Sequence, residues 1–271
     1  MKRPWEIFGY PINNVSPQAK TSRANYNCPY LNMKCKKQSR MINYPLGICS
    51  VQYGKDIIAI CPERFLQSKI VFVDISKEIF GTTDNILLFS EVRLNNIGSF
   101  DFVLVKHKPL SSDIEDFCIV EFQTDSTTGT GELVTAMSDF MKNNLKDDSY
   151  NFGMNTYNTI KLSYIQMLIK GQAMENWGKN IIWVMQSYVF ENMKKRFILK
   201  NLKYKTSNFN KFFIYDLARR ENIYTMKLCK KYSTTVSNLL KAFKHQPIPD
   251  LNEFLKVLKE KINLKIGLKI K

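Results

Sequence analysis

Short apolar runs separated by turn-forming residues dominate the middle of the chain. Residues 100–105 and 117–122 are almost wholly apolar, which is typical of buried strands. The stretch between them, residues 108–116, contains a proline, two serines and two aspartates and therefore favours a turn. The pattern predicts an antiparallel hairpin at the centre of the sequence.

Segments with other periods lie on both sides of this hairpin. They predict helices at residues 85–94, 132–143 and 159–175, and strands at residues 181–189 and 212–217. Residues 70–74 are expected to form a strand or the entry to the next domain. Six prolines exclude long helices from the first 70 residues and leave short strands at 48–53 and 57–60. From about Tyr224 the chain is lysine-rich with a helical period, so we expect a helical tail.

These elements predict an α/β (α+β) fold with a mixed central sheet flanked by helices. We expect three regions: a cysteine-containing region at 1–70, a core at 71–200 and a basic, mainly helical extension at 201–271. No run of eighteen apolar residues is present, which argues against a membrane span. The aromatic, proline-broken N-terminus is unlike a secretory signal, and a cytoplasmic location is expected.

The net charge of +16 is divided unevenly along the chain. Residues 1–70 carry 11 Lys and Arg against 3 acids, residues 71–150 carry 6 against 14, and residues 151–271 carry 23 against 7. Basic flanks attract a polyanion, whereas central carboxylates repel phosphate unless divalent cations neutralise them. The distribution favours a metal-dependent enzyme acting on nucleic acid over a merely solvated lysine-rich surface.

Four of the six cysteines fall within the first 61 residues: Cys28, Cys35, Cys49 and Cys61. Without a secretory signal, cysteines are more often thiolates or metal ligands than disulfides. Four thiolates in a loop-rich segment suit a structural metal ion, and their chemistry alone accepts zinc or iron. We therefore expect a small metal-binding knuckle near the N-terminus.

Two carboxylates interrupt the apolar runs of the central hairpin. Asp101 and Glu121 each lie inside a strand-like run, where an unpaired charge costs on the order of several kcal/mol. Pairing them centres the hairpin on Ser111, in the middle of the turn-forming stretch, and Gln123 shares a strand face with Glu121. A basic partner or a metal ion can offset the buried charge, and the grouping of these three side chains favours Mg²⁺.

The order of Asp101 and then Glu121-Phe122-Gln123 resembles the metal-binding signature of the PD-(D/E)XK nucleases. There the two acids bind Mg²⁺, and a final lysine positions the attacking water. Gln123 replaces that lysine and can orient a water through its amide. Lys161 is a candidate stand-in for the lysine, or a contact to the DNA backbone. Glu91, on a predicted helix, is a candidate auxiliary carboxylate or a solvent-facing residue.

The cysteines together with the Glu-x-Gln motif resemble the NotI-type restriction endonucleases. The matching stretches are residues 3–11, 28–37, 45–50, 61–65 and 121–123, and the likeness extends over about residues 3–190. The resemblance implies a PD-(D/E)XK core at 71–200, with catalytic Mg²⁺ on Asp101 and Glu121, Gln123 beside the attacking water, and Glu91 as the auxiliary acid. It also implies iron, in preference to zinc, on the four N-terminal cysteines.

The same resemblance implies a type II restriction endonuclease that hydrolyses double-stranded DNA and leaves 5′-phosphate ends. Cutting both strands of a palindrome requires two active sites, so we expect a homodimer, with a cognate DNA methyltransferase as a candidate partner. Basic residues near the cysteines are candidate DNA contacts: Arg23, Lys36, Lys37, Arg40 and Arg64. The alternative is a non-catalytic DNA-binding regulator with a metal knuckle, which leaves the central carboxylates without a purpose.

Overall fold

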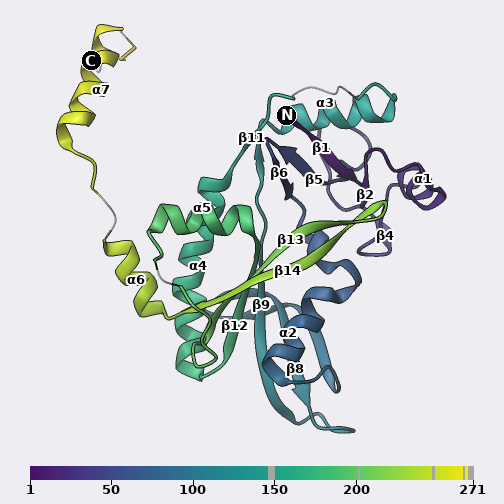
Figure 1. Ribbon diagram of the computed structural model, residues 1–271, viewed down its shortest axis with the longest axis vertical. Coiled ribbons are helices and arrows are strands. Elements are labelled where there is room, and N and C mark those ends of the chain that lie inside the picture. The colour runs from purple at the N-terminus through teal and green to yellow at the C-terminus, as the bar shows by residue number, and fades with distance from the viewer. Residues whose placement is uncertain (146–149, 201, 246–247, 265, 268–271) are drawn as a thin grey trace.

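A six-stranded mixed sheet forms the centre of the computed structural model, which describes residues 1–145, 150–200, 202–245, 248–264 and 266–267 (Figure 1). Its strand order is β14-β13-β12-β9-β8-β7. Strand β12 runs parallel to both β9 and β13, and the other neighbours are antiparallel. The strands are β7 (Ile86–Leu94), β8 (Gly98–His107), β9 (Ile114–Gln123), β12 (Asn180–Gln186), β13 (Asn210–Arg220) and β14 (Ile223–Thr234).

Helices cover both faces of this sheet. On one face, α4 (Thr156–Trp177), α5 (Ser187–Phe197) and α6 (Val236–Lys244) bury a core that includes Trp183. On the other face, a 3-10 segment, η1 (Pro62–Lys69), and α2 (Ile70–Phe80) bury Phe65 and Phe72 against Phe122. The predicted mixed α/β fold, with a central sheet flanked by helices, is therefore confirmed.

A second, smaller sheet of order β2-β1-β5-β6 is built mainly from the N-terminal region. Its apolar face packs against α3 in a separate core that contains Ile7, Val51 and Leu133. Gln186 joins the two sheets, because its side chain accepts from Ala59 N at 2.6 Å and donates to Ile57 O at 3.2 Å. The elements of this part are β1 (Lys2–Ile7), β2 (Tyr10–Pro11), α1 (Pro17–Ala24), β3 (Asn27–Cys28), β4 (Met33–Lys34), β5 (Ile48–Tyr53), β6 (Asp56–Ala59), β10 (Thr127–Thr128), α3 (Thr130–Met141) and β11 (Gly153–Met154).

Three expectations about local structure were wrong. The stretch 85–94, expected to be a helix, contains strand β7 (Ile86–Leu94), which pairs with β8 along nearly its whole length. Residues 70–74 begin helix α2, since a short unbroken apolar run fits a buried helix as well as a strand. The tail expected to be helical from Tyr224 first forms β14, whose pairing with β13 overrides the lysine-rich pattern.

The last described helix, α7 (Leu251–Asn263), lies away from the rest of the molecule and has no buried residue (Figure 1). Residues 201, 246–247, 265 and 268–271 of the expected extension lie outside the described residues. Among the helices that the structure describes, none has both the length and the apolar character needed to cross a bilayer.

Candidate active site and cysteine cavity

Asp101 and Glu121 face each other where the β8–β9 ladder ends. Phe102 pairs with Val120 and Val103 with Ile119, so the strands have the register predicted from the position of the turn. Beyond this last pair, the side chains replace the ladder bonds. Phe122 N donates to Asp101 Oδ2 at 2.9 Å, and Asp101 N donates to Glu121 Oε1 at 3.4 Å. Each carboxylate is thus fixed against the neighbouring strand.

Glu121 is only 1% exposed, and its carboxylate has a basic partner that the sequence did not reveal. Lys170 of α4 donates from Nζ to Glu121 Oε2 at 2.7 Å and to Ser99 O at 2.8 Å. Burial, and then the charge of Asp101, raise the pKa of Glu121 to about 7, while Lys170 acts in the opposite direction. The surroundings of Asp101 and Glu121 therefore stabilise two negative charges less well than water does.

The amide of Gln123 is also held by α4. Ser163 Oγ donates to Gln123 Oε1, and Gln123 Nε2 donates to Gln166 Oε1 at 3.2 Å. Ser163, Gln166 and Lys170 are spaced three and four residues apart, so they share the face of the helix that covers β9. One helix face therefore positions both Glu121 and Gln123.

A cavity of about 550 Å³ opens beside Asp101, and we call it the acid cavity because Glu63, Glu91 and Asp101 line it. Glu91 lies opposite Asp101, between the ladder residues Ser90 and Val92. Its φ of 54° is in the left-handed region, an uncommon and strained conformation for a residue other than glycine. Glu91 thus reaches the predicted site from a strand, not from the expected helix.

Glu63 is a member of the acid cavity that sequence reasoning missed. Burial raises its pKa, the charge of Lys36 lowers it, and the charge of Glu91 raises it further. The only local signal was its position two residues after Cys61, at the start of η1. Lys36 also lines this cavity, which places one basic side chain among the acids.

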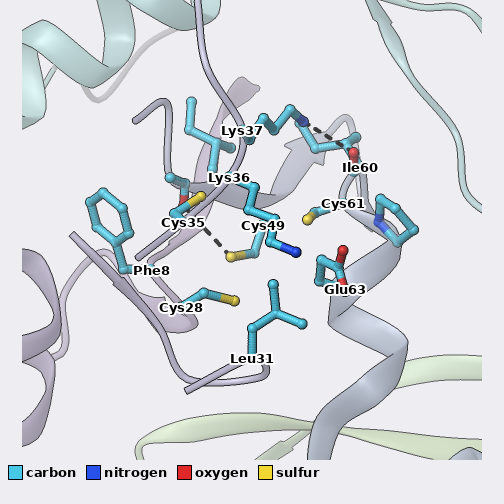
Figure 2. A pocket seen from close by; sticks show the side chains of 13 residues that line it. Phe8, Cys28, Leu31, Cys35, Lys36, Lys37, Cys49, Ile60, Cys61 and Glu63 are labelled. Atoms are coloured by element: carbon cyan, nitrogen blue, oxygen red, sulfur yellow. Dashed lines mark hydrogen bonds between the residues drawn. The ribbon is translucent and has the colours of Figure 1, made fainter. Parts of the chain in front are cut away.

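Cys28, Cys35, Cys49 and Cys61 line a second cavity of about 300 Å³, which we call the cysteine cavity. Figure 2 shows their sulfur atoms facing a common space. None of the four forms a disulfide. Burial raises the pKa of the Cys28 and Cys49 thiols, and raises that of Cys61 to about 11. The two cavities share part of their lining, namely Leu31, Lys36, Pro62 and Glu63.

The donor atoms of the two cavities differ in kind. Thiol sulfurs suit zinc or iron, whereas carboxylate oxygens suit Mg²⁺. Within the described residues, no group of three or more His, Cys, Asp or Glu side chains is arranged to hold a metal ion as the side chains lie. The donor atoms are of the kinds that the expected metals prefer, but the described side chains as they lie form no metal-binding group, and Glu121 does not line the acid cavity.

Two of the residues expected to contact DNA, Arg64 and Arg23, form hydrogen bonds within the protein. Arg64 is 0% exposed, its Nε donates to Glu6 at 3.0 Å, and its Nη2 donates to Tyr224 O at 2.7 Å. The expectation that Arg64 contacts DNA was therefore wrong. Arg23 donates to Asn14 O and Pro11 O, both at 2.6 Å, so its guanidinium fastens the N-terminal loop.

The remaining basic candidates lie nearer the solvent. Lys36 and Arg40 are exposed, and half-buried Lys37 donates to Ile60 O at 3.1 Å. Lys161, the candidate stand-in for the motif lysine, is exposed, with its ammonium 5.7 Å from the centre of the Tyr157 ring. Lys170 contacts the Glu-x-Gln motif itself, through Glu121 Oε2.

Comparison with known families shows to which family the chain belongs. The sequence model of the family described as restriction endonuclease NotI matches residues 6–228, which include both cavities and the strands β7 to β13. The chain belongs to the NotI restriction endonuclease family. Membership implies a type II restriction endonuclease, a site-specific nuclease that acts on double-stranded DNA. No curated protein matched this NotI-family chain in a direct comparison.

Proposed function

We propose that this NotI-family chain is an Mg²⁺-dependent endonuclease that hydrolyses DNA phosphodiester bonds at a specific sequence and leaves 5′-phosphate ends. The observation that carries this proposal is the opposed pair of Asp101 and Glu121 at the end of the β8–β9 ladder, beside the acid cavity. In this proposal the central sheet with α4 is the PD-(D/E)XK core. Restriction endonucleases generally use Mg²⁺, and the acids of this cavity provide the oxygen donors that it prefers.

Each side chain of the site has a separate task in this mechanism. Asp101 and Glu121 would hold the Mg²⁺, with Glu91 as the auxiliary acid on the opposite strand. When bound, the ion lowers the pKa of the attacking water and offsets charge at the scissile phosphate. Gln123 orients the water: α4 engages its oxygen and one N–H, and the second N–H has no partner among the described residues.

Exposed basic residues near the acid cavity would hold the DNA. Lys36 lines both cavities and can reach a phosphate next to the acids, and exposed Arg40 follows it on the same loop. Lys37 joins them if its bond to Ile60 O opens. We leave Arg23 and Arg64 out of this surface because both guanidinium groups are bound within the fold.

We further propose that the cysteine cavity binds one structural metal ion, iron in preference to zinc because of the family resemblance. Support comes from four thiols lining one cavity, a donor set that suits either metal. The ion would stabilise the loop that carries Lys36 and the start of η1 that carries Glu63, since both residues line both cavities. Metal analysis of the purified protein tests this proposal, with about one ion per chain as the expected result.

Assembly follows from the proposed reaction. Cutting both strands of a two-fold-symmetric site needs two copies of the acid cavity, so the chain would act as a homodimer. A DNA methyltransferase that modifies the same sequence would protect the host DNA from such an enzyme. Sedimentation of the protein with and without DNA tests the dimer directly.

Digestion of a mixed panel of plasmid and phage DNA tests the proposed activity. With Mg²⁺ we expect discrete fragments whose sequenced ends share one motif and carry 5′-phosphates, and with EDTA we expect intact DNA. The non-catalytic regulator predicts sequence-specific binding without fragments under both conditions. The Asp101–Glu121 pair favours the nuclease, because a regulator needs no opposed acids beside a cavity.

A further inference from the structure

The Glu-x-Gln motif lacks its lysine, and the structure supplies one from a distant part of the chain. Lys170 is 6% exposed and lies on α4, 49 residues after Glu121. Three contacts hold it: Glu121 Oε2 at 2.7 Å, Ser99 O at 2.8 Å, and the Phe100 ring, whose centre is 5.5 Å from Nζ. An ammonium fixed by three contacts also fixes the groups that it touches.

The carboxylate of Glu121 is oriented by two donors on its two oxygens. Lys170 binds Oε2, and Asp101 N binds Oε1 at 3.4 Å. Without Lys170, one oxygen of a buried carboxylate would lose its hydrogen bond and its compensating charge. Such an uncompensated buried charge is strongly destabilised, and the side chain would then turn or take up a proton.

We propose that Lys170 is a positioning residue for DNA cleavage, which holds the Glu121 carboxylate beside Asp101 from α4 and supplies the positive charge that the Glu-x-Gln motif lacks. This inference rests on the proposed nuclease function. Lys170 is too buried to reach DNA itself, so it acts through Glu121. Hydrogen-bond partners that orient a metal ligand contribute about 10- to 100-fold to metal affinity or activity, which sets the expected size of the effect.

A second lysine–acid pair on the same strand provides a matched control. Lys179 donates to Asp116 Oδ1 at 2.6 Å, and its ammonium lies 5.5 Å from the centre of the Phe117 ring. This pair is at the opposite end of β9, and its side chains are 31% and 38% exposed. It therefore reproduces the chemistry of the Lys170–Glu121 pair at a position where no cavity acids are present.

The test compares Lys170→Met, Lys170→Gln, Lys170→Arg and Lys179→Met in the full-length protein. We expect the two neutral variants at position 170 to lower the cleavage rate or the apparent Mg²⁺ affinity by about 10- to 100-fold. Calcium binding without DNA, measured by calorimetry, should weaken in parallel, and Lys170→Arg should recover part of both losses. Lys179→Met should match the wild type in both readouts, and circular dichroism should show all four variants folded.

Wild-type cleavage rate and calcium affinity in a folded Lys170→Met or Lys170→Gln variant would overturn the proposal. Loss in the neutral variants without any recovery in Lys170→Arg would also count against a role of the charge. If the wild-type protein itself never cuts DNA with Mg²⁺, the proposed function fails instead. Calcium affinity that falls in the neutral variants would still support Lys170 as the residue that positions Glu121.

Discussion

The cysteine cavity and the acid cavity adjoin each other and yet are built in opposite ways. Loops, strand β3 and strand β5 bring the four cysteines together, and Cys28 and Cys49 are buried. The acids of the other cavity come from η1 and from neighbouring strands of the central sheet, and hydrogen bonds hold Asp101 in place. The proposed roles differ accordingly, a structural metal for the cysteines and a catalytic metal for the acids, so changes at the two sites should affect different measurements.

The largest expected effect lies in the Asp101–Glu121 pair, of which Asp101 lines the acid cavity. Asp101→Asn or Glu121→Gln should reduce cleavage by roughly 100- to 1,000-fold or more, because each removes a charge that the reaction needs. Specific DNA binding in Ca²⁺, measured by gel shift, should persist. Glu115→Gln is the matched control, since this residue lies on the same strand and forms a partly exposed pair with Lys106 at 3.3 Å. Rapid Mg²⁺-dependent cutting by the folded Asp101→Asn/Glu121→Gln double variant would contradict the assignment.

The next effect should appear in the cysteine cavity as lost stability. Cys49→Ser removes a buried thiol from the set, so we expect the metal content to fall from about one ion per chain towards zero and Tm to drop by more than about 10 °C. Mass spectrometry of the native protein and thermal melts measure the two quantities. Cys229→Ser, at an exposed position on β14, should change neither. Equal metal content in both variants would show that the cysteine cavity is not the metal site.

The pH dependence of the free energy of unfolding should report on Glu121 of the acid pair. The pKa of Glu121 is raised from 4.5 to about 7, so the folded protein binds more protons than the unfolded chain between these values. Stability should therefore be greatest below pH 4.5 as far as this group is concerned, and fall by up to about 3 kcal/mol as the pH rises to 7. Urea unfolding in EDTA measures it. Glu121→Gln should flatten this part of the profile, and an unchanged slope would mean that Glu121 is ionised throughout.

The sequence predicts some features of these two sites and misses others. The register of Asp101 and Glu121 was predictable because a turn of known position fixes which residues face each other. The helix expected around Glu91 was wrong because pairing with β8 decides that segment, which the local pattern does not contain. The role of Lys170 could not be predicted either, because its partner Glu121 is 49 residues away in the sequence. Nothing in the residues of α4 around Lys170 indicates a partner on β9.

Arg64, near the cysteines, shows the same limit of prediction from local sequence. Three residues after Cys61 and inside a basic region, Arg64 has the sequence context of a DNA contact, but its partner Glu6 belongs to β1, 58 residues earlier. Nothing local to Arg64 indicates that β1 and η1 will meet. Buried ion pairs of this kind become visible only when the strands and helices are assembled, because their energy depends on both partners being removed from water together.

The smallest expected effect concerns the boundary that the cavities share. Glu63 lines both the cysteine cavity and the acid cavity. The charge of Glu91 raises the pKa of Glu63, so Glu63 interacts electrostatically with the acids. Glu63→Gln should therefore leave metal content and Tm unchanged while shifting the Mg²⁺ concentration for half-maximal cleavage by about 2- to 5-fold, the size of a partly solvated charge interaction. Glu115→Gln again serves as the control. A loss of metal from the cysteine cavity in Glu63→Gln, with cleavage kinetics unchanged per folded chain, would assign Glu63 to the cysteines instead and would mean that the two cavities are coupled through this residue.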